Sequence, residues 1–458
     1  MSLNLEPMAY FSIQGIQLTS LAKDFGTPLY VYDADKIREK ISVLRGSLKG
    51  FPLSIKYACK ANTNLSVLRI MLQNGVDLDV VSPQELALGI LAGYVGNQIT
   101  FTPSGVDFSE IEFAVGKGAI VNLDNLSVLE KFGQKYGSTK PCLIRIKPHV
   151  FGGGNEKIMT AHPESKFGIS IHQKEEILTI VNQYKIHVIG LHQHTGSDIK
   201  DGKTFQEAAS ALFDFAFDFK DLEIIDLGGG FKVPYSPEDP GVDMQEVGQL
   251  MSQSFLEFSR QYGRELKLWV EPGKFLVSEA GTFLAQATVV KNDPIKTFLG
   301  INTGLNHLIR PMMYGSYHYI FNASNANSAS QKAYRVVGNI CETDTFSFDF
   351  NGSLDSKLIG TIAFVWHPKR HIANFGYDLN KIYWGKGLMT EAIESVLKYA
   401  FEVQKIHRVE AQTDLQNIAS QRVLLKNGFV REGELRDKMF FRDRYNTVVS
   451  FSKLITDK

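Results

Sequence analysis

Several reactive side chains in this sequence directly follow short apolar runs. Lys60, His194 and Glu271 each stand at or just after the end of such a run. A lysine amine can form a Schiff base with a carbonyl compound, while a histidine and a carboxylate can hold or move protons beside it. Three consecutive glycines, at 228–230, follow another run, and their N–H groups can approach a phosphate closely. An amine together with a phosphate pocket is what pyridoxal phosphate (PLP) requires.

Each of these features has a structural explanation when it is taken alone. A lone lysine is more often snorkelling or paired than catalytic, and a glycine triplet is more often a tight turn. A histidine at a strand end is more often a hydrogen-bonded structural residue than a ligand. The prediction of a cofactor site therefore depends on the conjunction of the features at one place in the fold.

The elements that would bring them together are repeated strand–helix units between residues 53 and 273. Short apolar runs alternate there with amphipathic stretches such as 65–72, 83–91 and 205–219. Eight such units in series predict a parallel (β/α)8 barrel, which places the carboxyl ends of all strands at one rim. The runs begin near Ser54, Val76, Gln98, Ala119, Cys142, His187, Glu223 and Lys267. Asp79, His192 and Lys274 join the first group of side chains at the expected rim.

Two changes of pattern follow the barrel. Residues 275–346 are predicted to be β-rich with a loop at 322–332, and the first 25 or so residues to form a strand and connector that pair with this region. From 347 the pattern predicts a small α+β region. Its expected elements are strands at 357–366 and 372–379 joined by a turn at 367–370, a helix at 389–404, a strand at 409–413, a helix at 417–426 and a closing β pair at 429–454. The predicted domains are 1–26, 27–273, 274–346 and 347–458.

Composition excludes several classes of protein. The 458 residues carry 49 basic and 49 acidic side chains, so no net charge favours nucleic acid or an anionic membrane. The three cysteines are widely spaced and predict neither a disulfide framework nor a metal site. No signal peptide or membrane span is predicted, and a cytoplasmic location is expected.

Five motifs occur in an order that resembles the fold-type III PLP-dependent decarboxylases, which include the ornithine, arginine and diaminopimelate decarboxylases. The motifs are Tyr57-Ala-Cys-Lys-Ala-Asn62, His194-Thr-Gly-Ser197, Asp226-Leu-Gly-Gly-Gly-Phe231, Glu271-Pro-Gly-Lys274 and Cys341-Glu-Thr-Asp344. Two further stretches, 165–168 and 310–318, most resemble the diaminopimelate decarboxylases, which make lysine. The resemblance covers residues 27–345 and implies decarboxylation of meso-diaminopimelate.

The resemblance also implies a role for each matching residue. Lys60 would be the Schiff-base lysine, His194 would stack on the PLP ring, and Glu271 would bond the pyridine nitrogen. Asp79 and Lys274 would also lie in the cofactor site. The phosphate would be held by Ser197, Gly228, Gly229 and Gly230. Substrate would be held by Arg310 and Tyr314. Cys341, as proton donor, and Glu342, as substrate contact, would reach the site of a second subunit, which implies a homodimer.

Two departures from that family matter. Position 274 is Lys where the family most often has Arg, so the forked geometry is lost. The match stops at about 345–346, whereas the family continues into further strands that carry a tyrosine near the phosphate. The β-rich region is therefore predicted to be incomplete.

The remaining residues, 347–458, resemble part of a GNAT acetyltransferase of the kind that modifies ribosomal-protein N-termini. The matching stretches are 375–379, 383–392 and 417–429. A glycine-containing loop that opens a helix favours an anion, and in that family the anion is the pyrophosphate of acetyl-CoA. Gly385, Lys386, Gly387 and Asn417 are the implied acetyl-CoA contacts. The family's first strand and two helices have no counterpart here.

Three hypotheses follow from the sequence. The chain is a working decarboxylase with an appended module, a fusion of two incomplete and poorly active enzymes, or an acetyl-CoA-dependent N-acetyltransferase that uses the barrel as a scaffold. All residues implied in the Schiff base precede the change at 347, which favours the first. The missing strands favour the second, because exposed sheet edges cost stability.

Overall fold

The structure is a computed structural model, which describes residues 12–149, 165–199, 201–236, 239–294, 296–324, 334–343, 345–346, 360–367, 371–379, 381–441 and 444–457. The chain divides into two compact units, Met1–Phe350 and Asn351–Lys458. The predicted loop at 322–332 and turn at 367–370 lie mostly outside the described residues, and Asp344 lies wholly outside them.

Eight parallel strands close into a barrel in the first unit, so the predicted fold class is confirmed. Each strand pairs with its neighbours in the order β4-β5-β6-β7-β8-β10-β11-β12, and β12 returns to β4. The short β9 (Ile169–Ser170) adds to β8. The eight strands are β4 (Leu53–Ala58), β5 (Asp77–Val80), β6 (Ile99–Phe101), β7 (Ile120–Leu123), β8 (Pro141–Lys147), β10 (His187–His192), β11 (Ile224–Asp226) and β12 (Lys267–Val270). Most of their side chains are buried, which explains why they read as apolar runs.

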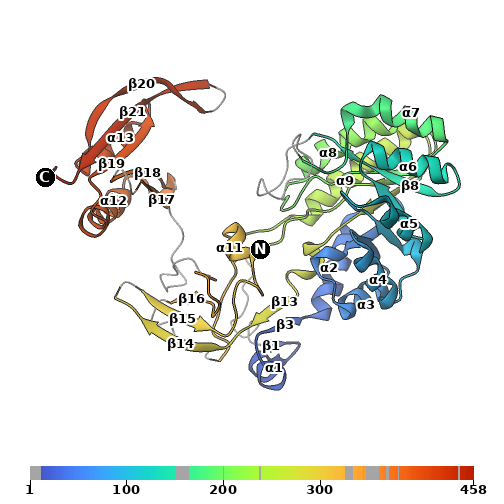
Figure 1. The fold of residues 1–458 in the computed structure, drawn as a ribbon, viewed down its shortest axis with the longest axis horizontal. Helices are drawn as coiled ribbons and strands as arrows, with labels where there is room; N and C mark the ends of the chain where they lie inside the picture. The colour runs from blue at the N-terminus through green and yellow to red at the C-terminus, as the bar shows by residue number, and fades with distance from the viewer. Residues whose placement is uncertain are drawn as a thin grey trace. The chain divides into compact units, whose positions relative to one another are not determined.

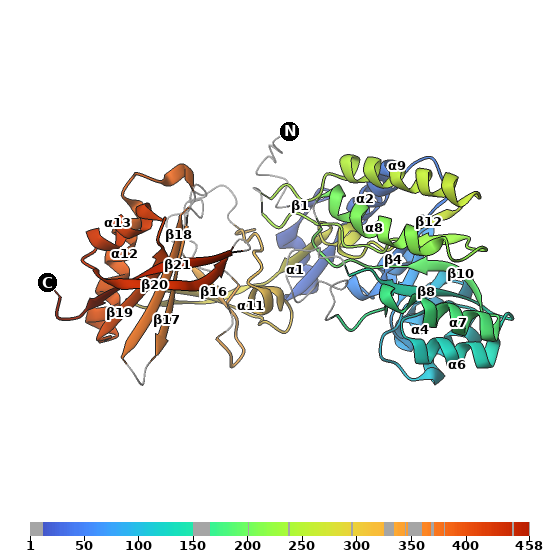
Figure 2. The ribbon, with the colours of Figure 1, turned by 90° about the horizontal axis from the view of Figure 1, so that it is seen from above.

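Helices surround this barrel, as Figures 1 and 2 show. They are α2 (Ala34–Ser47), α3 (Leu65–Gln73), α4 (Pro83–Ala92), α5 (Phe108–Gly116), α6 (Leu126–Tyr136), α7 (Lys174–Tyr184), α8 (Gly202–Ala216) and α9 (Met244–Tyr262). Helix α4 shows how local sequence sets the ends. Ser82 caps it, Pro83 occupies its first turn, and Gly93 ends it with φ 112°. Ser82, at the end of the second strand unit, therefore serves the helix.

The N-terminal region differs from the expectation. Strands β1 (Ser12–Ile13) and β2 (Ile16–Gln17) pair with each other, and residues Leu18–Phe25 form helix α1. The expected pairing with the β-rich region is therefore wrong for these residues, because Gln14 and Gly15 both have positive φ and close a tight hairpin. The strand that does pair with that region is β3 (Leu29–Tyr32), which runs antiparallel to β13 (Gly281–Leu284).

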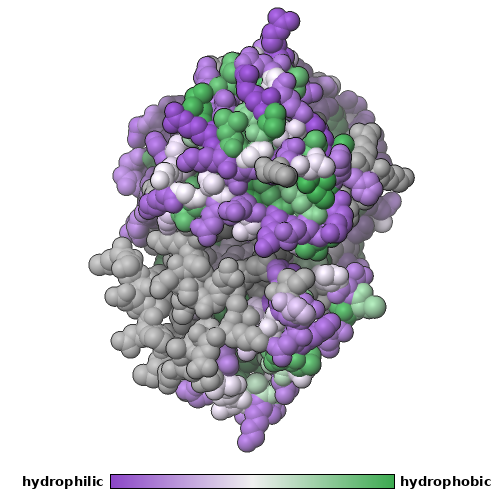
Figure 3. Space-filling view, turned by 90° about the vertical axis from the view of Figure 1, so that its left-hand side faces the viewer, coloured by the Kyte–Doolittle hydropathy of each residue, from purple (hydrophilic) through white to green (hydrophobic). Residues whose placement is uncertain are grey.

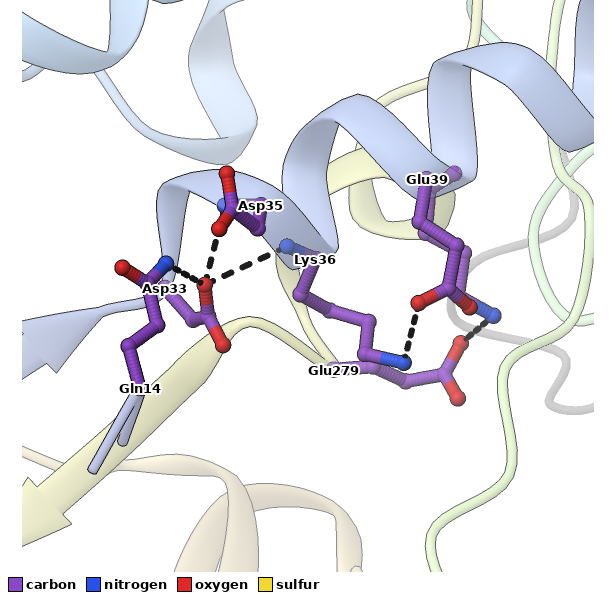
Figure 4. Close-up of polar contacts among 7 residues, drawn as sticks. Gln14, Asp33, Asp35, Lys36, Glu39 and Glu279 are labelled. Atoms are coloured by element: carbon purple, nitrogen blue, oxygen red, sulfur yellow. Dashed lines mark hydrogen bonds and ion pairs between the residues drawn. The ribbon is translucent and has the colours of Figure 1, made fainter. Parts of the chain in front are cut away.

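Polar contacts join this region to the barrel, as Figure 4 shows. The carboxylate of Asp33 caps helix α2 by accepting hydrogen bonds from the N–H groups of Asp35 and Lys36, at 2.9 and 3.3 Å. The side-chain amide of Gln14 donates to the same oxygen at 2.7 Å. Lys40, one turn further along α2, forms an ion pair with Glu279. These contacts fix the start of α2 beside the chain that leaves the barrel.

The β-rich region after the barrel contains a small sheet and two short helices. Strands β14 (Ala287–Asn292), β15 (Thr297–Ile301) and β16 (Arg335–Val337) pair in that order, and every residue of β14 is exposed. Helix α10 (Lys274–Val277) opens the region, and α11 (Arg310–Tyr314) follows β15. The helices were not predicted, because each is a single turn and too short for a helical period to be visible.

The second unit is a five-stranded sheet with two main helices. The strand order is β17 (Gly360–His367), β18 (Ile372–Leu379), β19 (Arg408–Asp414), β21 (Arg444–Leu454) and β20 (Val430–Phe441). Helix α12 (Leu388–Lys398) continues into a π-helical turn at Tyr399–Val403, and α13 is Ile418–Lys426. Each element lies within a few residues of its expected position. Hydrophilic residues make up most of the coloured surface in Figure 3, with hydrophobic residues in separate patches among them.

Candidate active site

Lys60 lies directly beyond strand β4, in a 3-10 turn at Cys59–Ala61. Its side chain is exposed, and its amine makes no hydrogen bond or ion pair with the part of the chain that the structure describes. Its charge nevertheless acts on neighbouring groups. Burial raises the pKa of Asp79 to about 7, and Lys60 opposes that rise. Burial also raises the pKa of Glu271 and lowers that of His194, and the charge of Lys60 lowers both. The charge of Lys60 therefore reaches all three side chains.

Glu271 is held by a histidine for which no role was predicted. His192, at the end of β10, is fully buried, and its Nε2 lies 3.0 Å from Glu271 Oε2. Burial lowers the pKa of His192 well below its usual value, so the ring is neutral. Because a carboxylate only accepts hydrogen bonds, the proton of that neutral ring belongs on Nε2. Glu271 thus has a fixed orientation before any ligand binds.

The glycine triplet packs tightly against the ends of β10 and β12. The N–H of Gly229 donates to His194 Nδ1 at 3.2 Å. A Cβ on Gly229 would lie 2.1 Å from the carbonyl oxygen of Glu271, and a Cβ on Gly230 would lie 2.1 Å from that of Gly196. Packing therefore requires these glycines whether or not a phosphate binds. The same contacts bring the triplet to the rim that carries Lys60.

Two further residues at this rim suit an anion. The Nζ of Lys274 pairs with Asp198 at 2.7 Å, and burial lowers the pKa of Lys274. Asp198 has φ 63° and was not predicted from the sequence. Neither the hydroxyl of Ser197 nor the N–H of Gly230 makes a hydrogen bond within the described residues. Two free donors and a nearby cation are what a phosphate group requires.

Arg310 and Tyr314 meet a tyrosine that the sequence reading missed. The Arg310 guanidinium stands 4.6 Å from the ring centre of Tyr235 and 5.8 Å from that of Tyr314. His318 packs edge-on against Tyr235, with ring centres 5.8 Å apart. Tyr235 Oη, Arg310 Nε and His318 Nε2 are all buried, and none has a hydrogen-bond partner among the residues that the structure describes. The only available signal for Tyr235 was an aromatic residue five positions after the glycine triplet.

Cys341 and Glu342 are not part of this cluster. Both are exposed, and no hydrogen bond or ion pair joins them to the rim residues within the described parts of the chain. Their expected role in the site of a second subunit stays a prediction.

The second unit presents its expected cofactor loop at the start of α12. Gly385 and Gly387 both have φ 76°, and Lys386 Nζ lies 5.3 Å from the ring centre of Tyr383. The carbonyl of Asn417's side chain accepts the N–H of Ser420 at 3.1 Å, so Asn417 caps α13. The contacts of these residues with acetyl-CoA stay predictions.

The rim fits PLP by its own chemistry. Both side-chain oxygens of Asp79 and Oε1 of Glu271 are buried and accept no hydrogen bond from the described residues. Nδ1 of His192 is likewise buried and has no partner among them. A cationic nitrogen heterocycle suits the carboxylate of Glu271, whose oxygens can each accept more than one hydrogen bond, and the Ser197 hydroxyl and the Gly230 N–H suit a phosphate. An exposed lysine amine beside this pocket completes the set.

Comparison with known proteins agrees with this geometry. The profile of the pyridoxal-dependent decarboxylase family, pyridoxal binding domain, matches residues 34–278. The chain belongs to the pyridoxal-dependent decarboxylases, so the predicted family is confirmed. A second profile, the GNAT acetyltransferase domain, matches residues 313–430, beginning earlier than the predicted boundary at 347.

Individual relatives narrow the comparison to diaminopimelate decarboxylases. The enzyme of Methanothermobacter thermautotrophicus is 33% identical over 346 residues, covering 74% of this chain and 81% of the relative. That of Streptomyces coelicolor is 34% identical over 344 residues, covering 73% of this chain and 77% of the relative. The crystal structure of the Helicobacter pylori enzyme, complexed with L-lysine, superimposes with a TM-score of 0.66 at 28% identity, covering 72% of this chain and 84% of that one.

Among the described helices, none combines the length and apolar character that crossing a membrane requires.

Proposed function

We propose that this protein decarboxylates meso-diaminopimelate to lysine with PLP as cofactor. The observation that carries the proposal is the convergence of Lys60, Glu271 and the glycine triplet at one rim of the barrel. The similarity to diaminopimelate decarboxylases over about three quarters of the chain supports the choice of reaction.

Bound PLP would supply a protonated ring that accepts the electron pair left when carbon dioxide departs. The amine of Lys60 would bind the cofactor's aldehyde, and the ring of His194 would lie against its face. Glu271, oriented by His192, would accept the N–H of the pyridine ring. Ser197, the triplet and Lys274 would hold the phosphate.

Substrate would be held by the cluster around Tyr235. Arg310 forms no ion pair with a carboxylate within the described residues, and the hydrogen bond that it donates to the Ser316 hydroxyl, at 3.3 Å, does not neutralise its charge. A guanidinium in that state suits a substrate carboxylate, which it can grip with two hydrogen bonds. Stacking on Tyr235 would keep it in position.

Two further parts of the proposal concern the assembly and its location. Cys341 and Glu342 would complete the site of a second copy of the chain. Both side chains are exposed, and within the described residues neither forms a hydrogen bond or ion pair with its own rim. We also propose a cytoplasmic location, for which the absence of a disulfide framework in the sequence is the support.

The decisive experiment is chemical trapping of the cofactor. The purified chain is incubated with PLP, reduced with borohydride and digested, and the modified peptide is identified by mass spectrometry. A pyridoxyl group on Lys60, retained in Lys49→Arg and lost in Lys60→Arg, supports the proposal. Absence of any adduct would favour the fusion of two inactive halves.

The substrate is then tested with the same preparation. Carbon dioxide release is measured with meso-diaminopimelate, ornithine and arginine at equal concentration. Preference for ornithine or arginine would overturn the proposed substrate while retaining the enzyme class.

An acetyl-CoA-dependent activity of the second unit is the second candidate, favoured by the GNAT profile. Protection of residues 384–389 from hydrogen exchange by acetyl-CoA would support it. Unchanged exchange at saturating acetyl-CoA would remove it.

A further inference from the structure

Three buried side chains meet beneath the proposed cofactor site. They are His192 at the end of β10, Asp226 at the end of β11 and Glu271 just after β12, and one nitrogen or oxygen atom from each lies within 4.8 Å of the others. Asp226 and His192 are fully buried and Glu271 is 6% exposed. They sit on three adjacent strands, because β10, β11 and β12 are neighbours in the barrel.

The hydrogen bonds of this cluster leave one oxygen of each carboxyl group without a donor. His192 Nε2 lies 3.0 Å from Glu271 Oε2, and the N–H of Gly228 donates to Asp226 Oδ1 at 2.9 Å. The remaining oxygens, Asp226 Oδ2 and Glu271 Oε1, have no donor among the described residues. One side-chain oxygen of Asp226 nevertheless lies within 4.8 Å of one of Glu271, and both carboxyl groups are buried. Two carboxylate oxygens cannot bond to each other unless one carries a proton.

The surrounding charges do not remove this requirement. Asp79, from β5, adds a third buried carboxyl that acts on both members of the pair. The cations that face the pair are Lys60, Arg145 of β8 and Lys56 of β4. Lys56 is itself paired with Asp77, at 3.1 Å. His192 is neutral, so it contributes a hydrogen bond and no charge.

We propose that Asp226 carries a proton on Oδ2 and donates it in a hydrogen bond to Glu271 Oε1. Asp226 is then a positioning residue, which holds Glu271 anionic and aimed at the pyridine nitrogen of the cofactor. This inference deepens the proposed function and rests on it for the identity of the cofactor.

The site decides which partner holds the proton. Burial raises the pKa of Glu271, but Lys60, Arg145 and the hydrogen bond from His192 oppose that rise and favour its anionic form. Burial, and then the charge of Glu271, raise the pKa of Asp226 well above its usual value. A protonated acid beside an ionised one is the arrangement that close carboxyl pairs adopt in other buried sites.

The variant Asp226→Asn distinguishes a neutral Asp226 that donates a hydrogen bond from an anionic Asp226 that acts through its charge. The amide has the shape of a protonated carboxyl: its oxygen can still accept from Gly228, and its NH2 can donate to Glu271. Asp226→Ala removes the donor. The full-length apoprotein of each is titrated with PLP, with the visible absorbance and the dissociation constant as readouts.

We expect Asp226→Asn to bind PLP within about 3-fold of the natural chain, and Asp226→Ala to bind about 10- to 100-fold more weakly, the range for a lost hydrogen bond to a charged group. Equal weakening in both variants would overturn the proposal, because it would mean that Asp226 acts through its charge. Full affinity in both would also overturn it, because Asp226 would then position nothing. Stoichiometric Zn²⁺ binding by the natural apoprotein that Asp226→Asn abolishes would assign the cluster to a metal instead.

A second readout does not need PLP. A proton held only in the folded state stabilises the protein at low pH, and that stability is lost as pH rises through the folded pKa. The natural apoprotein should therefore lose stability relative to Asp226→Asn between pH 5 and 8 in denaturant titrations. Parallel curves would overturn the shared proton even if Asp226→Ala does not fold. If the natural chain binds no PLP but these curves diverge, the proposed function fails and the proton assignment stands.

Discussion

The two units of this chain differ most in what they bury. The buried side chains of the first unit include Lys56, Asp79, Asp124, Arg145, His192, Asp226 and Glu271, whose charges act on one another at the proposed site. The buried polar side chains described in the second unit are Thr413, Asn446 and Ser452, none of which ionises in the ordinary pH range. Burying an ionisable group costs free energy, so such groups gather where chemistry requires them. The buried ionisable groups therefore indicate that the reactive chemistry belongs to the barrel.

The second unit is distinguished instead by the backbone conformation of its predicted cofactor loop. Its loop before α12 bends through two glycines with positive φ, and the Nε1 of the exposed Trp384 donates to the carbonyl of Leu379 at 2.7 Å. A loop of this kind can bind a ligand through its backbone N–H groups. The rim of the barrel also carries ionisable side chains, which can take part in a reaction.

The largest effect that would sharpen this contrast is expected at Lys60. Lys60→Ala removes the amine that binds the cofactor and should lower kcat/KM for meso-diaminopimelate by at least about 10³-fold. Lys49→Ala, an exposed lysine outside the site, is the control. Retained activity in Lys60→Ala would place the chemistry elsewhere and break the comparison.

The next effect is a pH dependence of stability from Asp79. Its folded pKa is raised to about 7 by burial, so between pH 4 and 7 the folded apoprotein holds a proton that the unfolded chain has released. The contribution of Asp79 to the free energy of unfolding is therefore fully present below pH 4. It is lost as pH rises through 7, and the loss is at most about 4 kcal/mol.

Asp79→Asn cannot titrate and should flatten that fall in urea titrations at pH 4.5, 6 and 8. Asp24→Asn, at an exposed position, should leave it unchanged. An unaltered slope in Asp79→Asn would show that Asp79 stays ionised when buried.

A smaller effect is expected at Arg310. Arg310→Leu removes a charge-assisted grip on a carboxylate, worth about 1.5 to 3 kcal/mol. KM for meso-diaminopimelate should rise by roughly 10- to 100-fold, with PLP binding unchanged. A fall in PLP affinity instead of a rise in KM would mean that Arg310 serves the phosphate.

Tyr235 is expected to act through Arg310 and therefore less strongly. Tyr235→Leu removes the ring 4.6 Å from the guanidinium and should raise KM by about 2- to 30-fold, the range of a cation–π contact. Tyr235→Phe keeps the ring and should stay near the natural value. If Phe and Leu variants lose equally, the hydroxyl matters and the stacking does not.

The smallest effect tests the independence of the second unit. Gly387 has φ 76°, where a Cβ costs about 1 to 2 kcal/mol. Gly387→Ala should destabilise the second unit by that amount without changing PLP binding, as hydrogen exchange of α12 and a PLP titration would show. Loss of PLP binding would mean that the two units are coupled.

The barrel and its rim could be predicted from the order and composition of the chain. Strand positions followed from short apolar runs, and the order of the chain places the ends of parallel strands together, so Lys60 and the triplet could be expected to meet. The N-terminal hairpin and helix could not be predicted, because Gln14 has no marked preference for the positive φ that closes the turn.

The contacts between side chains at that rim could not be predicted in the same way. His192 and Glu271 are 79 residues apart and meet because β10 and β12 flank the same strand, β11. Tyr235 reaches Arg310 in the same way, from a loop that no sequence period describes. Periodicity is a local property of the chain, whereas a contact between two loops depends on how the whole barrel closes, so the network that orients the site could be seen only in three dimensions.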